Sequence, residues 1–534
     1  MSAPETIGVI GAGTMGAGIA QLACLTGAKT MLHDPVAEAL ARGAESIEKR
    51  FEHEAQRGRL GEAQARDAAA RLHPVRSLGD LAECRLVIEA APESLELKRE
   101  LFGRLSGEVL SADAVLATNT SSLLVTAIAA GTQRPERVVG MHFFNPAPVM
   151  RLVEVIAGEQ SAEWALALAR ATGEAMDRHV IVAADGPGFL VNRCNRPFGL
   201  EALRLLQERV APVEQIDRIC RLGAGFRMGP FELMDLVGID VGLEVSRSFY
   251  EQSFGEPRWR PSPIAVRMVA AGRLGRKSGR GYYDYAGGEH RPADPEPPRA
   301  GGGDGIVVVA GESALAAELR EAAATAGWEV AEPLEAGGRE PPFLILDLTL
   351  DGEDPQAPLQ GAPQAICCAS GSLAALDPGG AAVGFHALPP FAPAQIVELC
   401  RGRDTSAAAA AAAERFFTTL GKAPEWVADA PGMVLGRIVC QVINEAAFAL
   451  GEGVGSAEDI DAGMVHGLNY PRGILAWADA IGLDHVLAVL LAMAEERRDE
   501  RYRPAPTLHG LALSGRLGHQ TGAGFFNYDD SGMI

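Results

Sequence analysis

The sequence predicts two copies of one arrangement, an α/β domain with a doubly wound parallel sheet followed by an all-α domain. Three observations predict it. Short β-branched runs alternate with helical stretches from residue 6 to about 185, strand patterns are missing from 186 to about 280, and the alternation resumes at 306. Such alternation is typical of a parallel sheet covered by crossover helices. A chain of 534 residues is long enough for several domains.

Matching segments show that the chain repeats itself. Residues 185–193 (DGPGFLVNR) match residues 429–437 (DAPGMVLGR) 244 positions later, and 279–285 (GRGYYDY) match 522–528 (GAGFFNY). A segment rich in Gly and Pro separates the two copies and is expected to be a linker. The predicted domains are therefore a first α/β domain (1–185), a first helical domain (186–285), the linker (286–304), a degenerate α/β domain (305–428) and a second helical domain (429–534).

Composition and charge exclude several classes of function. Lys and Arg number 48 against 69 Asp and Glu, a net charge of −21 that disfavours a nucleic-acid partner. No apolar run reaches the length of a bilayer helix, so no membrane partner is expected. The folded pattern begins near residue 6, which predicts a cytoplasmic location. The eight cysteines form no CxxC pair, so neither disulfides nor a metal site is expected.

A glycine-rich turn near the amino terminus predicts a dinucleotide site in a Rossmann-type domain. The turn follows a predicted strand, opens a helix and precedes Asp34, which ends the next strand. Its glycines allow a tight turn and close approach to a pyrophosphate at the helix N-terminus. A carboxylate at Asp34 would hold the ribose hydroxyls and repel a 2′-phosphate, which favours NAD over NADP. The predicted contacts in the turn are Gly11, Gly13, Thr14, Met15 and Gly16.

A histidine and a glutamate on two neighbouring predicted strands form a candidate catalytic pair. The strand 138–142 ends at His142, and the apolar strand 152–156 carries Glu154. A carboxylate in an apolar run needs a partner, and a histidine on the adjacent strand can supply it. The pair suits a general base and its orienting group, and the alternative is a purely structural hydrogen bond.

Five longer motifs add to these features. They are TNTSSL (118–123), GMHFFNP (140–146), PGFLVNR (187–193), GAGFRMGPFE (223–232) and GRKSG (275–279). Through these motifs, the sequence resembles the L-3-hydroxyacyl-CoA dehydrogenase family over residues 5–285.

The resemblance implies a role for each matching residue. By similarity, His142 is the catalytic base and Glu154 is its partner, while Ser121 and Asn192 hold the substrate oxygen and the base in register. Residues expected to contact the cofactor are Glu93, Lys98, Asn145 and Lys277. The family also has a helical arm that reaches CoA. The helical stretch 39–59 matches this arm, so Arg50 and Arg57 are candidates for the CoA phosphates.

The implied reaction is NAD-dependent oxidation of a (S)-3-hydroxyacyl-CoA to the 3-ketoacyl-CoA. Double-length members of the family act in phenylacetate breakdown and in butyrate metabolism, which suggests 3-hydroxybutyryl-CoA or 3-hydroxyadipyl-CoA within β-oxidation chemistry. Two alternatives remain open at this point. One is another Rossmann β-hydroxyacid dehydrogenase that acts on a free acid, and the other is a non-catalytic NAD-binding relative.

The second copy has lost most of the implied machinery, and we expect it to be catalytically silent. Ser313 replaces Gly13, and the position of Ser121 falls near Gly371. The pair His386 and Glu398, 244 residues after the first pair, is expected to survive for packing. Three more positions change: Asn145 becomes Pro389, Asn192 becomes Gly436 and Lys277 becomes Gln520.

The second helical domain has a further expected role. In the family, the helical domains of two subunits pair to complete the substrate cleft, so the fused copy could act as an intramolecular partner. A homo-oligomer of the whole chain remains possible.

Overall fold

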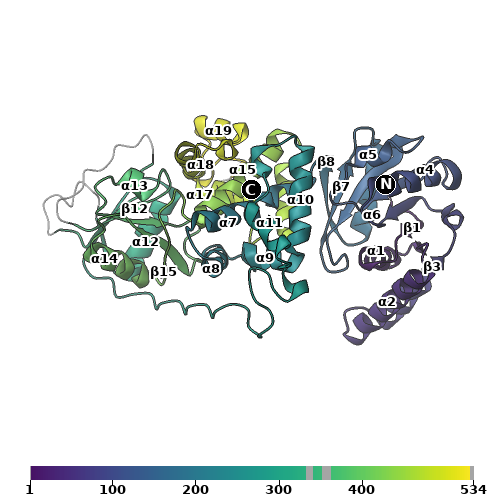
Figure 1. Cartoon of the computed structure of the whole chain (residues 1–534), viewed down its shortest axis with the longest axis horizontal. Coiled ribbons are helices and arrows are strands. Elements are labelled where there is room, and N and C mark those ends of the chain that lie inside the picture. Colours follow the sequence, from purple (N-terminus) through teal and green to yellow (C-terminus); the bar gives the residue numbers. More distant parts are fainter. Residues whose placement is uncertain (1, 332–340, 351–361, 529–534) are drawn as a thin grey trace. The chain divides into compact units, whose positions relative to one another are not determined.

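The computed structural model describes residues 2–331, 341–350 and 362–528. Its contacts divide the chain into two compact units. The first unit contains the residues up to Arg193 together with Gly453–Leu468, and the second contains Cys194–Glu452 and the residues from Asn469 onward. Figure 1 colours the elements along the sequence, from purple strands in the first unit to green strands in the second.

The first unit is built on an eight-stranded sheet of order β3-β2-β1-β4-β5-β6-β7-β8. All neighbouring strands are parallel except β6 and β7, which are antiparallel. The strand order reverses between β1 and β4, where open α/β sheets bind ligands at the carboxyl ends of their strands. The strands are β1 Thr6–Ile10, β2 Lys29–His33, β3 Leu72–Val75, β4 Leu86–Glu89, β5 Val115–Thr118, β6 Val138–Phe143, β7 Leu152–Ala157 and β8 His179–Ala184.

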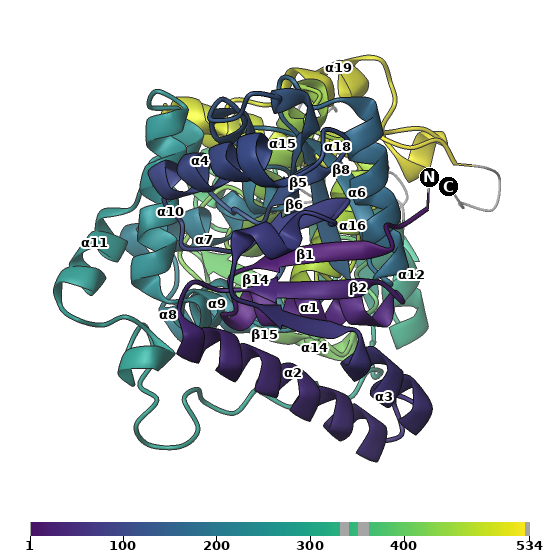
Figure 2. The ribbon, with the colours of Figure 1, turned by 90° about the vertical axis from the view of Figure 1, so that its right-hand side faces the viewer.

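Helices cover this sheet, and apolar side chains from both layers form its core. Ile7, Ile19 and Val139 are fully buried there. Figure 2 shows the long helix α2 beside α1 and α3, which it contacts. The helices are α1 Thr14–Leu25, α2 Ala37–Gln56, α3 Glu62–Ala70, α4 Leu95–Arg104, α5 Val125–Ala129 and α6 Glu163–Ala175.

One helix of the first unit comes from far along the chain. Helix α16 (Ala457–Leu468) packs against β7 and β8, and Ala184 N–H donates to Val454 O at 2.8 Å just before it. Gly463 permits this approach, because a Cβ there would lie 3.0 Å from Ile181 Cδ1 on β8. The predicted second helical domain thus contributes one helix to the first unit.

The second unit repeats the α/β pattern in a seven-stranded sheet of order β10-β9-β11-β12-β13-β14-β15. As in the first sheet, one adjacent pair, β13 and β14, is antiparallel and the others are parallel. The strands are β9 Ile306–Ala310, β10 Glu329–Ala331, β11 Leu344–Asp347, β12 Gln364–Cys367, β13 Val383–His386, β14 Ile396–Arg401 and β15 Ala423–Trp426. The helices α12 Ala314–Ala326, α13 Leu373–Leu376 and α14 Ala407–Thr419 accompany them.

The remaining helices form the helical part of the second unit. They come from both copies of the repeat, so the predicted fold, a Rossmann-type domain followed by helices and then repeated, is confirmed. These helices are α7 Val191–Glu208, α8 Val213–Ala224, α9 Pro230–Val237, α10 Ile239–Gln252, α11 Pro263–Ala270, α15 Leu435–Gly451, α17 Ile474–Ile481, α18 Leu483–Arg497 and α19 Pro506–Leu513.

Among the described residues, no single helix combines the length and the apolar composition needed to cross a bilayer. The pair α17 and α18 passes that test only when the two are joined, and they meet at a bend of 95°.

Candidate functional site

The antiparallel pairing of β6 and β7 places His142 directly opposite Glu154. His142 Nδ1 lies 2.6 Å from Glu154 Oε2, and the two residues are only 6% and 0% exposed. The other carboxylate oxygen accepts hydrogen bonds from the backbone N–H groups of Leu190 (3.2 Å) and Val191 (2.9 Å), where α7 begins. The carboxylate is therefore held from two sides, and Nδ1 donates to it. This leaves Nε2 as the basic nitrogen of the ring.

Aromatic rings surround the imidazole of His142. The centroid of Phe144 lies 4.7 Å away and that of Phe189 lies 5.8 Å away. Phe189 adopts a φ of +54° directly after Gly188 at +70°, in the tight turn that leads into α7. These rings fix the tilt of the imidazole and keep water from its faces. A base held in this way enters a reaction without reorganising its surroundings.

The loop that carries Ser121 follows β5 and is anchored by Glu93. Glu93 Oε1 accepts from the hydroxyls of Thr120 (2.5 Å) and Ser122 (2.9 Å) and from Ser121 N–H (3.1 Å). Burial alone would raise the pKa of Glu93, but Lys98 and these donors outweigh it and the pKa is lowered. The carboxylate therefore stays charged and holds the loop in place.

A buried ion pair lies behind this loop. Lys98 Nζ is 2.7 Å from Glu89 Oε1 and 3.3 Å from Glu93 Oε2, and Lys98 and Glu89 are 1% and 0% exposed. Glu89 also accepts from Thr118 Oγ1 and Ala91 N–H, at 2.7 and 2.6 Å. Our sequence analysis missed Glu89, although its signal is the one that identified Glu154, a single acid in an apolar strand. Lys98 thus joins Glu89 at the end of β4 to the Ser121 loop.

The glycine-rich turn fits a dinucleotide pyrophosphate. Gly11 has a φ of +97°, and a Cβ there would lie 2.5 Å from Ala90 O. At Gly16 a Cβ would lie 1.7 Å from Gly11 O, whereas Gly13 faces open space. Gly13 caps α1 without a side-chain hydrogen bond, so the first amides of the helix remain available to an anion. The turn has the open backbone that NAD binding requires.

Asp34 stands beside this turn at the end of β2. Its two carboxylate oxygens accept from Ala12 N–H (2.8 Å) and Val36 N–H (2.9 Å), which holds it at the edge of the turn. Thr14 is exposed and Met15 is half-buried. This placement suits the predicted contact of Asp34 with the ribose hydroxyls.

Ser121 and Asn192 flank the histidine strand. Ser121 follows β5, which pairs with β6, and Asn192 is next to Val191, whose N–H bonds to Glu154. Both side chains are half-buried. In the described part of the chain no hydrogen bond joins either of them to His142, so their roles toward a substrate stay predictions.

The other predicted contacts are spread over both units. Asn145 is exposed after β6, next to the cis bond to Pro146. Lys277 belongs to the second unit, where its Nζ lies 2.6 Å from Asp240 Oδ1 in the turn Arg276–Ser278. Their roles at the cofactor also stay predictions.

A cavity of about 580 Å³ opens beside α2 in the first unit. Three arginines line it, the predicted Arg50 and two that sequence reasoning missed, Arg59 and Arg178. Arg57 is exposed after the end of α2 and does not line the cavity. The other lining residues are Gln21, Leu22, Leu25, Phe51, Glu54, Leu60, Pro146, Pro148 and Val149.

The expected survival of the second histidine–glutamate pair is wrong. His386 does stand opposite Glu398 in the strand register, but its Nε2 bonds to His485 Nε2 at 3.2 Å, and its Nδ1 has no hydrogen-bond partner in the described chain. Gly436 explains the change, because a Cβ there would lie 2.3 Å from His386 Cε1. The ring thus occupies space that the side chain at the equivalent position, Asn192, would need.

Burial has marked effects on this altered pair. It raises the pKa of Glu398 to about 8 and lowers the pKa of His485 to about 4. Burial and the neighbouring His485 together lower the pKa of His386 well below its usual value. All three groups are therefore uncharged near neutral pH. Among the residues that the structure describes, Glu398 accepts hydrogen bonds only from Val434 N–H and Leu435 N–H, at 2.8 and 2.9 Å.

The strand register also corrects the equivalent of Ser121. Ile366 pairs with Gly384 as Thr118 pairs with Gly140, so Ser121 corresponds to Ala369 and not to the region of Gly371. The hydroxyl is absent from the second copy.

The second glycine-rich turn carries its own cap. Ser313 Oγ accepts from Ala316 N–H at 3.3 Å at the start of α12, where Gly13 in the first copy offers no side chain. The segment that would carry the equivalent of Asp34 lies outside the described residues.

Comparisons with known proteins agree with this division. Residues 6–186 match the model of the 3-hydroxyacyl-CoA dehydrogenase NAD-binding domain. Residues 188–285 and 432–528 both match that of the 3-hydroxyacyl-CoA dehydrogenase C-terminal domain.

Curated relatives match either the whole chain or its first half. The chain is 37% identical to a 3-hydroxyadipyl-CoA dehydrogenase of Escherichia coli over 95% of this chain and 98% of that one. It is 40% identical to a 3-hydroxybutyryl-CoA dehydrogenase of Bradyrhizobium diazoefficiens over 54% of this chain and 98% of that one. A solved structure of a 3-hydroxybutyryl-CoA dehydrogenase from Escherichia coli K12 superposes with a TM-score of 0.81 and 35% identity, covering 96% and 99% of the two chains.

Proposed function

The chain belongs to the 3-hydroxyacyl-CoA dehydrogenase family, and from that premise we propose that its first half oxidises a (S)-3-hydroxyacyl-CoA with His142 as the general base. The observation that carries the proposal is the 2.6 Å contact between His142 Nδ1 and Glu154, with the carboxylate anchored at the start of α7. The glycine-rich turn and Asp34 would hold NAD, which would supply the acceptor for the hydride from C3 of the substrate.

The protein residues move and stabilise the proton. His142 Nε2 takes the proton of the substrate hydroxyl, and the ring becomes an imidazolium. Glu154 is negatively charged in this role and favours the imidazolium through Nδ1. A base of this kind contributes about 10²- to 10⁴-fold to the rate. Ser121 and Asn192 donate to the substrate oxygen, and the Glu89–Lys98–Glu93 network holds the Ser121 loop for that contact.

The cavity beside α2 supports a CoA thioester over a free acid. Arg50, Arg59 and Arg178 line one opening in a chain whose net charge is −21, against a single acid, Glu54. The guanidinium of Arg178 also donates to the backbone oxygens of Met150 and Met176. Guanidinium groups bind phosphates bidentately. We assign the CoA phosphates to this cavity and give Arg57 a lesser role. Two relatives are named for 3-hydroxybutyryl-CoA and 3-hydroxyadipyl-CoA, so we propose a short or dicarboxylic acyl chain.

The test uses the full chain, with NADH absorbance as the readout. The substrates are 3-hydroxybutyryl-CoA, 3-hydroxyadipyl-CoA, the N-acetylcysteamine thioester of 3-hydroxybutyrate and the free acid. We expect turnover of at least one CoA ester. The truncated thioester should be turned over with a raised KM, and the free acid should not be turned over. Arg50→Met should reduce the difference in KM between the CoA ester of 3-hydroxybutyrate and its N-acetylcysteamine thioester. Equal turnover of ester and free acid would refute the proposed substrate class.

Buried ion pairs within the second unit support an intramolecular partner. Arg437 on α15 is fully buried, and it bonds to Glu201 (2.9 Å) and Glu208 (2.7 Å), both on α7. In return, Arg258 from the first copy bonds to Glu445 on α15 at 2.8 Å. The two helical copies therefore recognise each other within one chain. We propose that the second copy takes the place that a second subunit has in half-length members of the family.

The cytoplasmic location expected from the sequence stays a prediction.

A further inference from the structure

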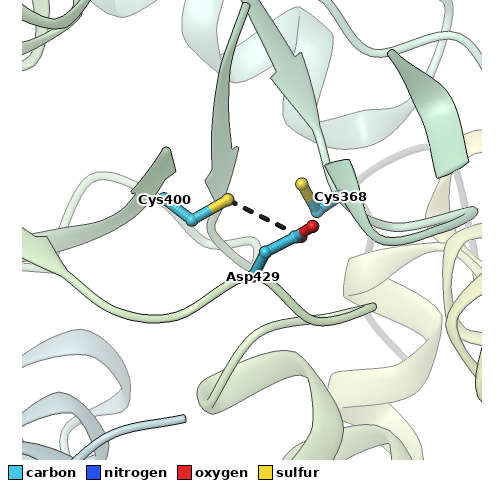
Figure 3. Close-up of side chains that lie close together, drawn as sticks. All are labelled: Cys368, Cys400 and Asp429. Carbon is cyan, nitrogen blue, oxygen red and sulfur yellow. Dashed lines mark hydrogen bonds between the residues drawn. The ribbon is translucent and has the colours of Figure 1, made fainter. Parts of the chain in front are cut away.

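Two cysteines and an aspartate converge in the second sheet, away from the proposed dehydrogenase site. Cys368 follows β12, Cys400 lies in β14 and Asp429 follows β15 (Figure 3). One ligand atom from each, two Sγ and a carboxylate oxygen, lie within 4.8 Å of one another. Cys400 Sγ is 3.7 Å from Asp429 Oδ1. Both cysteines are fully buried, whereas the aspartate is half-buried.

Both sulfurs lie over the middle strand β13. A Cβ added at Gly384 would lie 2.4 Å from Cys400 Sγ and 2.8 Å from Cys368 Sγ. Cys400 reaches this point from β14, where it pairs with Gly384. Cys368 reaches it from the other side, where its N–H donates to Phe385 O at 2.9 Å. The glycine therefore opens the space in which the thiols meet.

The strand geometry disfavours a disulfide between these thiols. Neighbouring strands lie about 4.8 Å apart, so the backbones on either side of β13 are separated by roughly 10 Å. A disulfide needs Cα atoms within about 7 Å. A cation bound to two thiolates at ~2.3 Å each holds the sulfurs roughly 4 Å apart, which suits the observed cluster.

The first half shows which other side chains this fold accepts at the two cysteine positions. By the strand registers, Cys368 corresponds to Thr120 and Cys400 to Ile156. Asp429 corresponds to Asp185. Asp185 caps α5, which follows the loop that carries Ser121, and Asp429 caps the equivalent helix α13. The aspartate is therefore a shared structural feature. The two thiols are particular to the second half.

Asp429 can coordinate a cation while it still caps α13. Its Oδ1 accepts from Leu373 N–H (2.7 Å) and its Oδ2 from Ala374 N–H (2.9 Å). Each carboxylate oxygen has a second lone pair. Because this side chain is the half-exposed member of the cluster, it also provides the route from solvent to the thiols.

We propose that Cys368, Cys400 and Asp429 bind one zinc-class divalent cation, with water as the fourth ligand. Two sulfurs and one oxygen select Zn²⁺ over Mg²⁺ or Ca²⁺, because thiolates prefer softer cations. Binding replaces the two thiol protons, which leave to solvent, with two metal–sulfur bonds. The site fixes β12, β14 and the segment after β15 to one another.

Cobalt titration of the reduced, metal-stripped full chain tests the proposal. Co²⁺ should bind at one equivalent per chain with thiolate charge-transfer bands, and Zn²⁺ should displace it. Cys368→Thr and Cys400→Ile install the residues of the first half, so they remove the ligands with side chains that this fold accepts. Each variant should lose the bands, keep its 3-hydroxyacyl-CoA dehydrogenase activity, and melt at the same temperature as the metal-free parent protein, which reports correct folding of the second unit.

Cys367→Ala is the matched control. Cys367 is the neighbouring buried cysteine, and its side chain points to the opposite face of β12, so this variant should bind cobalt as the parent protein does. A cobalt spectrum without thiolate bands, bands that survive Cys368→Thr, or a native disulfide joining Cys368 to Cys400 would each overturn the proposal.

Discussion

His142 and His386 occupy the same strand position in the two halves of the chain, yet their rings have different partners. The ring of His142 donates to the carboxylate of Glu154. The ring of His386 makes no hydrogen bond to Glu398 and contacts His485 instead. A single change accounts for much of this, because Gly436 frees the space that the Asn192 side chain needs. A retained histidine and glutamate thus do not by themselves indicate a retained active site. In the second half the residues on α15 and α18, Gly436 and His485, decide which way the ring points.

The largest expected effect concerns what the two halves still share, their helical interface. Arg437→Met leaves Glu201 and Glu208 without their buried partner. Removing one member of a buried ion pair costs about 3–5 kcal/mol, so we expect a loss of that size in the free energy of unfolding. Chemical denaturation measures it. Arg403→Met, at an exposed pair with Asp404, is the matched control and should change stability little.

The next largest effect is a difference in kcat between variants of Glu154 and of Glu398. Glu154→Gln should lower kcat on the order of 100-fold, because the imidazolium loses its counter-charge, while the Kd for NAD stays unchanged. Glu398→Gln should leave kcat as it is. Steady-state kinetics on both variants check the difference, and a comparable loss of kcat in Glu398→Gln would show that the second half takes part in catalysis.

A smaller effect is expected at the two glycine-rich turns. Gly13→Ser gives α1 the cap that α12 already has, and it occupies an amide that the pyrophosphate needs. We expect the Kd for NAD to rise about tenfold, the worth of one hydrogen bond to a charged group. Ser313→Gly should lower the free energy of unfolding by only a few tenths of a kcal/mol, and it should not create a second NAD site. Calorimetric titration measures both, and unaltered NAD affinity in Gly13→Ser would contradict the assigned pyrophosphate site.

The last predicted effect is a pH dependence of stability in the second half. Burial raises the pKa of Glu398 to about 8, above its value of ~4.3 in an unfolded chain. The folded state therefore binds this proton more tightly, so the stability it contributes is full below pH ~4 and is lost as the pH rises through about 8. Glu398→Gln carries no such proton, and its Tm should fall less than that of the parent between pH 5 and 8.5. Parallel Tm curves would exclude a buried neutral Glu398.

Most of the architecture could be predicted because it depends on local patterns. Alternating strands and helices gave both sheets, and the 244-residue offset gave the repeat. The pairing of His142 with Glu154 followed from one polar residue on each of two adjacent strands. Glu89 carried the same signal and could have been found in the same way.

The rest depends on contacts between distant segments. The bond from His386 to His485 spans 99 residues and arises from the missing side chain at Gly436. The arginines around the α2 cavity come from two distant segments, 50–59 and the residue before β8, and α16 joins the first unit from beyond residue 450. The spacing of residues along the sequence carries no information on such long-range contacts.

The most direct test of the central claim compares His142→Gln with His386→Gln in the full chain. The measurement is kcat for reduction of acetoacetyl-CoA, with the Kd for NAD as the control for an intact site. We predict a fall of about 10²- to 10⁴-fold in kcat for His142→Gln, with NAD affinity retained, and no loss for His386→Gln. Turnover that survives in His142→Gln, or that is lost in His386→Gln, would contradict the assignment of the chemistry to the first half.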